Sequence, residues 1–243
     1  MMKISRRQVL ASALPLLASA QPRPLSVICV GGHPDDPESG CGGTLARYAE
    51  LGHHVTIVYL TRGEAGIAGK SHDEAAAIRS AECLAACKIL GAKPVFAGQI
   101  DGATVVDRSA AQSLTKLIAA EQPDVVFTQW PIDTHPDHEA ASLLTYRAWM
   151  AMERRFDLYY YEVDLGAQTM NFHPTDYVDI TSVREKKKAA LFAHKSQDGE
   201  QIYRRHHEVM ENYRGRESGV PAAEAFVRLA SGRSRSASLP GLR

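Results

Sequence analysis

Two short segments rich in histidine and aspartate constrain the fold of this chain more than any other feature. The first, residues 31–38 (GGHPDDPE), follows the apolar run 25–30, and the second, residues 134–138 (THPDH), comes shortly after the β-type run 124–128. A helical pattern follows each segment. In a parallel sheet, the loops that lead from strands to helices lie at the carboxyl edge, where α/β folds place their sites. The sequence therefore predicts that these distant segments meet at one point.

The rest of the chain repeats this alternation of buried strand and helix. Strands are expected at 25–30, 55–60, 94–97, 124–128, 158–163 and, as the last strand, 177–180, with helices at 40–52, 73–90, 107–120, 138–152 and 181–193. A length of 243 residues with 44% hydrophobic residues is enough for one substantial core. We expect a single α/β domain with a Rossmann-like, mostly parallel sheet and helices on both faces. A dinucleotide is disfavoured, because the first loop lacks Gly-x-Gly-x-x-Gly and carries two acidic residues.

The two ends of the chain differ from this domain. Residues 1–20 resemble a twin-arginine signal peptide, with Arg6 and Arg7 before a short apolar run and small residues at 18–20, which predicts an exported protein, periplasmic or extracellular. The alternatives are an ordinary basic leader or a misassigned start. The apolar run is too short to span a bilayer comfortably, so no stable membrane span is expected in the mature chain. Residues 231–243, rich in Ser, Gly and Arg, are expected to be disordered.

Charge and cysteine content narrow the function classes. Lysine and arginine number 28, as do aspartate and glutamate, so the formal net charge is zero. The chain lacks the basic field that nucleic-acid binding needs, and a neutral or locally polar substrate is expected. The four cysteines are too few for a disulfide scaffold and are predicted to be buried apolar residues: Cys29, Cys41, Cys83 and Cys87. Cys41 lies near the proposed site, so metal ligation is the alternative for this residue.

The histidine and aspartate spacing indicates a metal centre. His33 and Asp36 are three residues apart in a turn that contains proline, as are His135 and His138. A catalytic zinc ion takes three protein ligands and leaves a fourth position open, and His33, Asp36 and His138 form such a set. Asp35 is adjacent to a ligand and is left as the carboxylate base. His135 is the spare imidazole, available as an acid or to stabilise an oxyanion.

Three further residues near these segments are candidates for the site. Asp137 lies beside His135 and ahead of a helix, so it either orients that histidine, which is favoured, or caps the helix. Arg62 faces the substrate or steadies a carboxylate, with a solvated salt bridge as the alternative. Trp130 lines the pocket or supports its loop.

The motifs taken together resemble the PIG-L/LmbE family of zinc-dependent N-deacetylases. The matching segments are 33–36 (HPDD), 38–45 (ESGCGGTL), 61–64 (TRGE), 135–138 (HPDH), 194–197 (HKSQ) and, more weakly, 223–226 (AEAF). The resemblance covers most of the chain after the leader, so the deacetylase-like domain is placed at 21–230. It implies metal ligation by His33, Asp36 and His138, a general base at Asp35 and an electrostatic or acid role for His135.

The resemblance also implies that His194, within HKSQ, lies near the site or at a subunit contact. As a bare sequence feature, this histidine is more simply a C-terminal helix cap. Six other histidines lack a ligand-spaced partner set and are expected on the surface or in loops: His53, His54, His72, His173, His206 and His207. Arg79 and Glu82, three residues apart in one helical run, are expected to pair on the helix surface or to brace the loop above it.

The function that these features favour is zinc-dependent removal of an N-acetyl group from an N-acetylglucosamine-type saccharide or conjugate, releasing acetate and a free amine. One zinc ion per chain is expected, although iron or cobalt can also occupy such sites. A metal-dependent hydrolase of another amide or an ester, and a non-catalytic zinc- or sugar-binding protein, are the alternatives. The presence of both Asp35 and His135 favours an enzyme. A homo-oligomer is left open.

Overall fold

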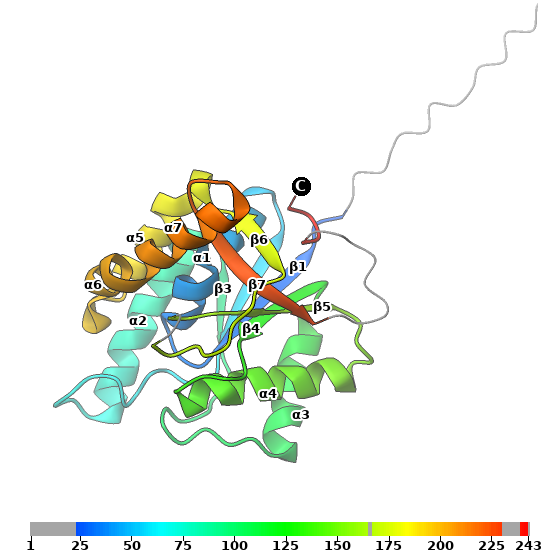
Figure 1. The fold of residues 1–243 in the computed structure, drawn as a ribbon. Coiled ribbons are helices and arrows are strands. Elements are labelled where there is room, and N and C mark those ends of the chain that lie inside the picture. The colour runs from blue at the N-terminus through cyan, green and yellow to red at the C-terminus, as the bar shows by residue number, and fades with distance from the viewer. Residues whose placement is uncertain (1–22, 165–166, 230–238, 243) are drawn as a thin grey trace, which may run out of the picture.

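The computed structural model describes residues 23–164, 167–229 and 239–242 (Figure 1). A seven-stranded sheet runs through the domain in the order β3-β2-β1-β4-β5-β7-β6. The strands are β1 (Ser26–Gly31), β2 (His54–Tyr59), β3 (Lys93–Phe96), β4 (Val125–Gln129), β5 (Asp157–Tyr161), β6 (Asp176–Asp179) and β7 (Ala223–Leu229). The strands β1 to β5 are parallel, and β7 runs antiparallel to its neighbours β5 and β6. The prediction of a mostly parallel α/β sheet is confirmed.

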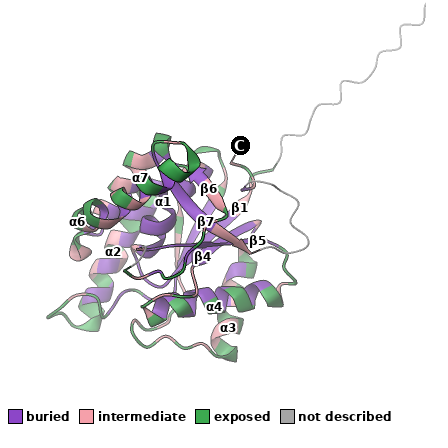
Figure 2. Ribbon diagram, in the orientation of Figure 1, coloured by how far each residue is buried: buried purple, intermediate pink, exposed green. Residues whose placement is uncertain are grey.

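Helices cover both faces of this sheet. The α-helices are α1 (Asp36–Glu50), α2 (His72–Leu90), α3 (Arg108–Ala120), α4 (Pro136–Ala151), α5 (Arg184–Phe192), α6 (Gly199–Ile202) and α7 (Glu208–Ser218). Short 3-10 turns occur at η1 (Thr181–Val183) and η2 (Lys195–Gln197), and a π-helical turn, η3 (Tyr203–His207), joins α6 to α7. Side chains alternate along β1: Cys29 packs with α1 and α2, whereas Ile28 and Val30 pack with α3 and α4. Strands buried on both faces follow from this arrangement, as Figure 2 shows.

The chain after α4 departs most from the expected order of elements. The strand at 177–180 was predicted to be the last, but β7 follows it and inserts between β5 and β6. The β7 sequence begins Ala-Glu-Ala, which has little β-propensity of its own, so its place depends on pairing with both neighbouring strands. The helix expected at 40–52 instead begins at Asp36, because Pro37 suits the first helical turn. The predicted Asp107 cap of α3 is confirmed by its bond from the Ala110 N–H.

Buried ion pairs attach the C-terminal helices to the sheet and to α1. The Lys187 ammonium on α5 lies 2.8 Å from carboxylate oxygens of both Glu211 on α7 and Glu224 on β7. The other contacts of Glu224 reach α1, where the N–H groups of Gly43 and Thr44 donate to its carboxylate. All three charged side chains are buried. We call Lys187, Glu211 and Glu224 the ion cluster.

The chain ends lie partly outside the described residues. The predicted signal peptide (1–20) falls there, as do residues 230–238 and 243 of the tail that was expected to be disordered. Residues 239–242 of that tail depart from the expectation, because Leu239 is buried and the Tyr48 hydroxyl donates to the Pro240 carbonyl at 2.8 Å. The four cysteines are free and buried, as predicted. Among the described residues, no helix is both long and apolar enough to cross a membrane.

Candidate active site

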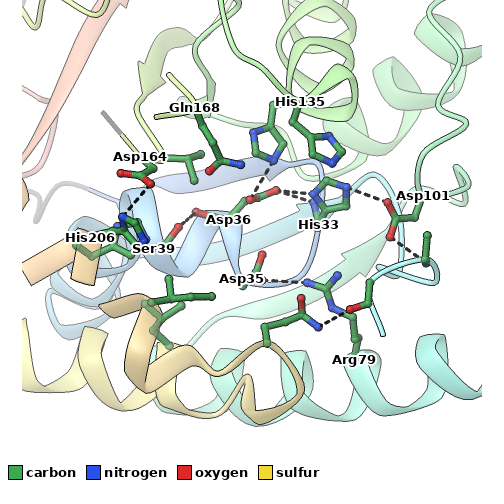
Figure 3. Close-up of a pocket in the computed structure, with 18 of the residues that line it drawn as sticks. His33, Asp35, Asp36, Ser39, Arg79, Asp101, His135, Asp164, Gln168 and His206 are labelled. Atoms are coloured by element: carbon green, nitrogen blue, oxygen red, sulfur yellow. Dashed lines mark hydrogen bonds and ion pairs between the residues drawn. The ribbon is translucent and has the colours of Figure 1, made fainter. Parts of the chain in front are cut away.

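The two histidine and aspartate segments meet at the carboxyl ends of β1 and β4, as the sequence predicted. They form one side of a cavity of about 500 Å³ (Figure 3). Its other walls come from the loops after β2, β3 and β5 and from the segment between α5 and α7. The described residues that line it are His33, Asp35, Asp36, Ser39, Ala65, Gly66, Arg79, Asp101, Gly102, His135, His138, Val163, Asp164, Gln168, Leu191, Gln197, Ile202, His206 and His207.

The three predicted metal ligands face one another in this cavity. The two oxygens of Asp36 separate the histidines: Oδ2 lies 3.2 Å from Nδ1 of His33, and Oδ1 lies 3.2 Å from Nε2 of His138. All three side chains are buried. Two imidazole nitrogens thus lie next to one carboxylate, and these are donor types that zinc takes in catalytic sites.

Each of these two histidines has its other ring nitrogen next to a carboxylate. Nε2 of His33 lies 3.0 Å from Asp137 and 3.2 Å from Asp101. Nδ1 of His138 lies 3.1 Å from Asp133. A metal-binding histidine typically donates its remaining N–H to a carboxylate, which fixes the tautomer and the ring orientation. The three side chains therefore fit a divalent metal both in their donor atoms and in the carboxylates that orient the two histidine rings.

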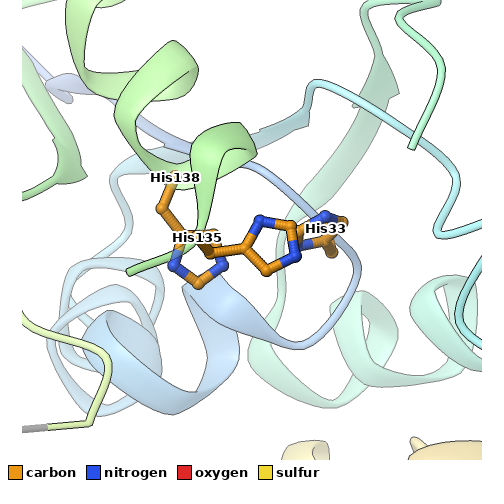
Figure 4. Close-up of side chains that lie close together, drawn as sticks. All are labelled: His33, His135 and His138. Atoms are coloured by element: carbon orange, nitrogen blue, oxygen red, sulfur yellow. The ribbon is translucent and has the colours of Figure 1, made fainter. Parts of the chain in front are cut away.

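The protonation of the cluster is consistent with a cation site. Burial lowers the pKa of His138, but the carboxylates of Asp36 and Asp133 outweigh it and raise this pKa to about 9. Burial acts on Asp36 in the opposite sense, yet the charge of His138 holds its pKa well below the usual range. Three histidines place ring nitrogens within 4.8 Å of one another: His33, His135 and His138 (Figure 4). A bound cation would replace the protons that this arrangement attracts.

His135 occupies the N-cap of α4 and is held as a neutral imidazole. Its Nδ1 accepts a hydrogen bond from the backbone N–H of Asp137 at 3.2 Å, and its ring stacks on His138 at a centroid separation of 4.7 Å. Burial lowers the pKa of His135, as do the neighbouring histidines. Because Nδ1 is an acceptor, the proton of the neutral ring lies on Nε2. His135 therefore has one N–H available as a donor.

The prediction that the Asp137 carboxylate orients His135 is wrong. Its oxygens instead contact His33 and accept hydrogen bonds from the N–H of Gly102 and the hydroxyl of Thr104, at 2.8 and 2.6 Å. The adjacent position in sequence misled, because the first turn of α4 directs this side chain toward β1. Asp137 thus supports a metal-facing histidine.

Asp35 lies beside the metal-facing cluster in an unusual backbone conformation, with a φ of 110°. The Arg79 guanidinium lies 3.0 Å from its Oδ2 and also donates to the Pro34 carbonyl. Burial raises the pKa of Asp35, against the opposing effect of Arg79. Residues that keep a positive φ without being glycine concentrate at functional sites. The structure thus presents a fixed carboxylate of raised pKa next to the proposed metal position.

Arg79 and Glu82 each brace a loop, which confirms one of the two roles expected for them. They do not pair on the surface of α2: Arg79 is buried against the loop of Asp35. Glu82 accepts hydrogen bonds from the backbone N–H and the hydroxyl of Ser196, at 2.8 and 2.6 Å. One helix therefore holds both the first motif loop and the HKSQ turn.

None of the three residues expected to bind substrate lines the cavity, namely Arg62, Trp130 and His194. The side chain of Arg62 is 47% exposed and lies 3.7 Å from Glu64. Trp130 supports its loop, since its Nε1 donates to the Met170 carbonyl at 2.9 Å. His194 is fully buried, with Nε2 3.2 Å from Glu38.

His194 supports the first motif loop from below. Its partner, the Glu38 carboxylate, accepts hydrogen bonds from the Asp35 backbone N–H at 3.2 Å and the Tyr59 hydroxyl at 2.7 Å. The resemblance correctly indicated that this histidine lies close to the site. It lies beneath the loop and outside the cavity.

Several cavity residues escaped the sequence analysis. The loop after β3 gave no signal for Asp101, and the loop after β5 gave none for Asp164 or Gln168. The expectation that His206 and His207 lie on the surface or in loops is wrong for His207, which is buried in the π-helical turn η3. His206, in the same turn, is partly exposed, and both residues line the cavity. The spacing of these two histidines in the sequence matches no pattern of metal ligands. Their place in the cavity is seen only in the fold, where the turn η3 brings them to the site.

Three comparisons agree with this geometry. A family model for PIG-L, GlcNAc-PI de-N-acetylase, matches residues 28–149. A diacetylchitobiose deacetylase from Thermococcus kodakarensis is 30% identical over 191 residues, covering 73% of this chain and 72% of that protein. The N,N'-diacetylchitobiose deacetylase structure from Pyrococcus horikoshii has a TM-score of 0.73 and 27% identity, covering 84% of this chain and 83% of that one.

A fourth similarity shows how far the fold alone extends. The structure of GalB, a 4-carboxy-2-hydroxymuconate hydratase from Pseudomonas putida, has a TM-score of 0.74 at 23% identity, covering 88% of this chain and 100% of that one. At this identity only the fold is shared. The reaction must therefore be argued from the residues of the site.

Proposed function

The chain belongs to the PIG-L (GlcNAc-PI de-N-acetylase) family, and from this premise we propose that it removes the acetyl group from an N-acetylglucosamine-type saccharide or conjugate. Acetate and a free amine are the products. The observation that supports this proposal most strongly is that residues 33–36 supply two metal-facing side chains and, separate from them, a candidate general base. His33 and Asp36 face His138, while Asp35 is held apart from them by Arg79.

We propose that His33, Asp36 and His138 hold one divalent metal, with zinc the ion that best suits the donor set and iron or cobalt as alternatives. When bound, such an ion supplies Lewis acidity to the amide carbonyl. The carboxylates of Asp101, Asp133 and Asp137 fix the histidine rings in the required tautomers.

Side chains of the protein carry out the proton transfers and stabilise the developing charge. Asp35 takes a proton from the attacking water, and its raised pKa brings it closer to the working range of a general base. The Nε2–H of His135 donates to the oxygen that gains charge as the amide is attacked. Asp35, once protonated, or His135 then delivers a proton to the leaving amine.

The decisive experiment measures acetate release by the zinc-loaded protein from a panel of N-acetylated saccharides, other amides and esters. Asp35→Asn keeps the shape of the side chain and removes its basicity. We expect its acetate release to fall by about 10²- to 10⁴-fold, the usual worth of general-base assistance, with zinc content and thermal unfolding close to wild type.

Each alternative has its own signature in this experiment. A hydrolase for another bond would release its product from a different member of the panel. A sugar-binding protein would show no turnover at all. Loss of zinc from Asp35→Asn would make Asp35 a ligand, and full activity would move the base to another residue, with His135→Gln the next variant to measure.

A further inference from the structure

The wall of the cavity opposite Asp101 carries polar groups that the proposed reaction does not use. Figure 3 shows Asp164 and His206 at the end of the cavity away from Asp101, joined by an ion pair between His206 Nδ1 and Asp164 Oδ2 at 2.9 Å. The pair is partly accessible, with side-chain exposures of 34% and 17%. Gln168 and Gln197 line the same cavity.

His207, next in the chain, adds an independent sign of a ligand. It lines the cavity and is 2% exposed, yet its Nδ1 has no hydrogen-bond partner among the described residues. A buried polar atom without a partner is unusual, because it forfeits its hydrogen bond to water. His206 and His207 both belong to the π-helical turn η3, and such turns often mark functional positions.

The charges around the cavity limit what this wall can hold. The described residues that line it include four aspartates, whereas Arg79 is their one lysine or arginine and already pairs with Asp35. Burial lowers the pKa of His207 to about 3, so this ring is neutral at ordinary pH. A phosphate placed here would face the Asp164 carboxylate, and the lining residues offer it no lysine or arginine that is free of a carboxylate partner.

From these observations we propose that Asp164, His206 and His207 form a subsite for the part of the substrate beyond the acetamido group, and that it accepts a neutral, hydroxyl-rich group such as a second sugar and disfavours a phosphorylated one. The inference rests on the proposed function and adds the substrate class. Imidazole, carboxylate and carboxamide groups are hydrogen-bond partners for sugar hydroxyls. Leu191 and Ile202 add apolar surface to the same wall.

The test compares N,N'-diacetylchitobiose with N-acetylglucosamine 1-phosphate, using the zinc-loaded full chain. Wild type should turn over the disaccharide with the higher kcat/KM. His206→Gln should raise KM for the disaccharide about tenfold, the worth of one charge-assisted hydrogen bond, with kcat and zinc content little changed. His173→Gln, an exposed histidine, is the matched control and should behave as wild type.

Reversal of the charge is the sharper variant. Asp164→Lys should shift the kcat/KM ratio about tenfold toward the phosphorylated sugar, because a repulsive charge becomes an attractive one. The inference is overturned if wild type prefers the phosphorylated sugar, or if His206→Gln and Asp164→Lys leave KM and the ratio unchanged. Deacetylation would then stand without the subsite.

Calorimetric binding of N,N'-diacetylchitobiose separates the two failures. If no sugar in the panel is turned over but the disaccharide binds, and binding weakens in His206→Gln and not in His173→Gln, the subsite stands and the deacetylase proposal fails. Neither turnover nor binding would refute both.

Discussion

The two sides of the cavity are held in place by different forces. The metal-facing side rests on β1 and β4, central strands whose side chains are buried among apolar residues on both faces. The opposite side comes from the loop after β5 and from α5 to α7, helices that the ion cluster attaches to β7 and α1. The family model spans 28–149, which contains the first side and ends before the second. The proposed metal-facing residues thus lie in regular β-α units, whereas part of the proposed subsite lies on helices that long-range charge pairing holds in place.

The largest effect is expected from a substitution on the metal-facing side of the cavity. Asp36→Ala removes the carboxylate that lies between His33 and His138, so we expect loss of bound metal and a fall in acetate release of about 10³-fold or more. Elemental analysis and turnover measure both. Asp176→Ala, on β6, is the control. The metal-free variant should also unfold at a lower temperature than metal-free wild type, because the lowered pKa of Asp36 beside His138 means that its carboxylate stabilises the folded state; metal content is therefore compared on folded protein. Full metal content would exclude Asp36 as a ligand.

The second prediction breaks the other side. Lys187→Met removes the ammonium that contacts both buried carboxylates, which leaves Glu224 with the N–H groups of Gly43 and Thr44 and leaves Glu211 with Arg184 and the Tyr203 hydroxyl. We expect a loss of about 3 kcal/mol in the free energy of unfolding, the low end for a broken buried ion pair, measured with urea. Lys186→Met is the matched control, because Lys186 is partly exposed and its pair with Glu50 should be worth less than about 1 kcal/mol.

The same variant also tests the contrast between the two sides. At a temperature where Lys187→Met is still folded, its zinc content and kcat should stay close to wild type. A variant that kept its stability but lost its metal would show that the ion cluster supports the reaction and not the fold.

The third prediction distinguishes the structural role of Asp137 from the role that its sequence position suggested. Because Asp137 contacts His33, Asp137→Asn should weaken zinc binding by about 10- to 100-fold in competition with a chelator. Zinc-saturated variant should recover most of its turnover. Unchanged zinc affinity with lowered turnover would favour an effect through His135.

The effect that is smallest near neutral pH concerns the protonation of His207. Burial, together with the charges of Lys187 and His206 and against the effect of Asp36, lowers its pKa to about 3. Below its ordinary pKa near 6.5, the unfolded chain binds a proton that the folded chain does not, so stability falls as the pH falls toward 3. The contribution is about 1.4 kcal/mol per pH unit. His207→Gln should remove this slope from the difference in unfolding free energy between variant and wild type, and parallel curves would contradict the assignment.

The sequence predicted the metal-facing side of the cavity better than the opposite side. The metal-facing residues were found because they lie in the segments that lead from two strands, which periodicity reveals, to the helices that follow them. Asp137 was correctly predicted to lie at the site, but its carboxylate contacts His33 and not His135. The first turn of α4 sets the direction of this side chain, and sequence spacing does not reveal it. His207 and β7 were missed, because one depends on a π-helical turn and the other on strands far away in sequence.

The backbone of Asp35 bears on the choice of an inactive variant for capturing the natural substrate from a cell extract. A trap must bind substrate and metal without turning the substrate over. Alanine loses the contact with Arg79 and lets the loop, with its φ of 110° at Asp35, relax and displace Asp36, whereas asparagine keeps the shape of the side chain and an oxygen that accepts from Arg79. Asp35→Asn is therefore the variant suited to affinity capture, with the retained molecule identified by mass spectrometry.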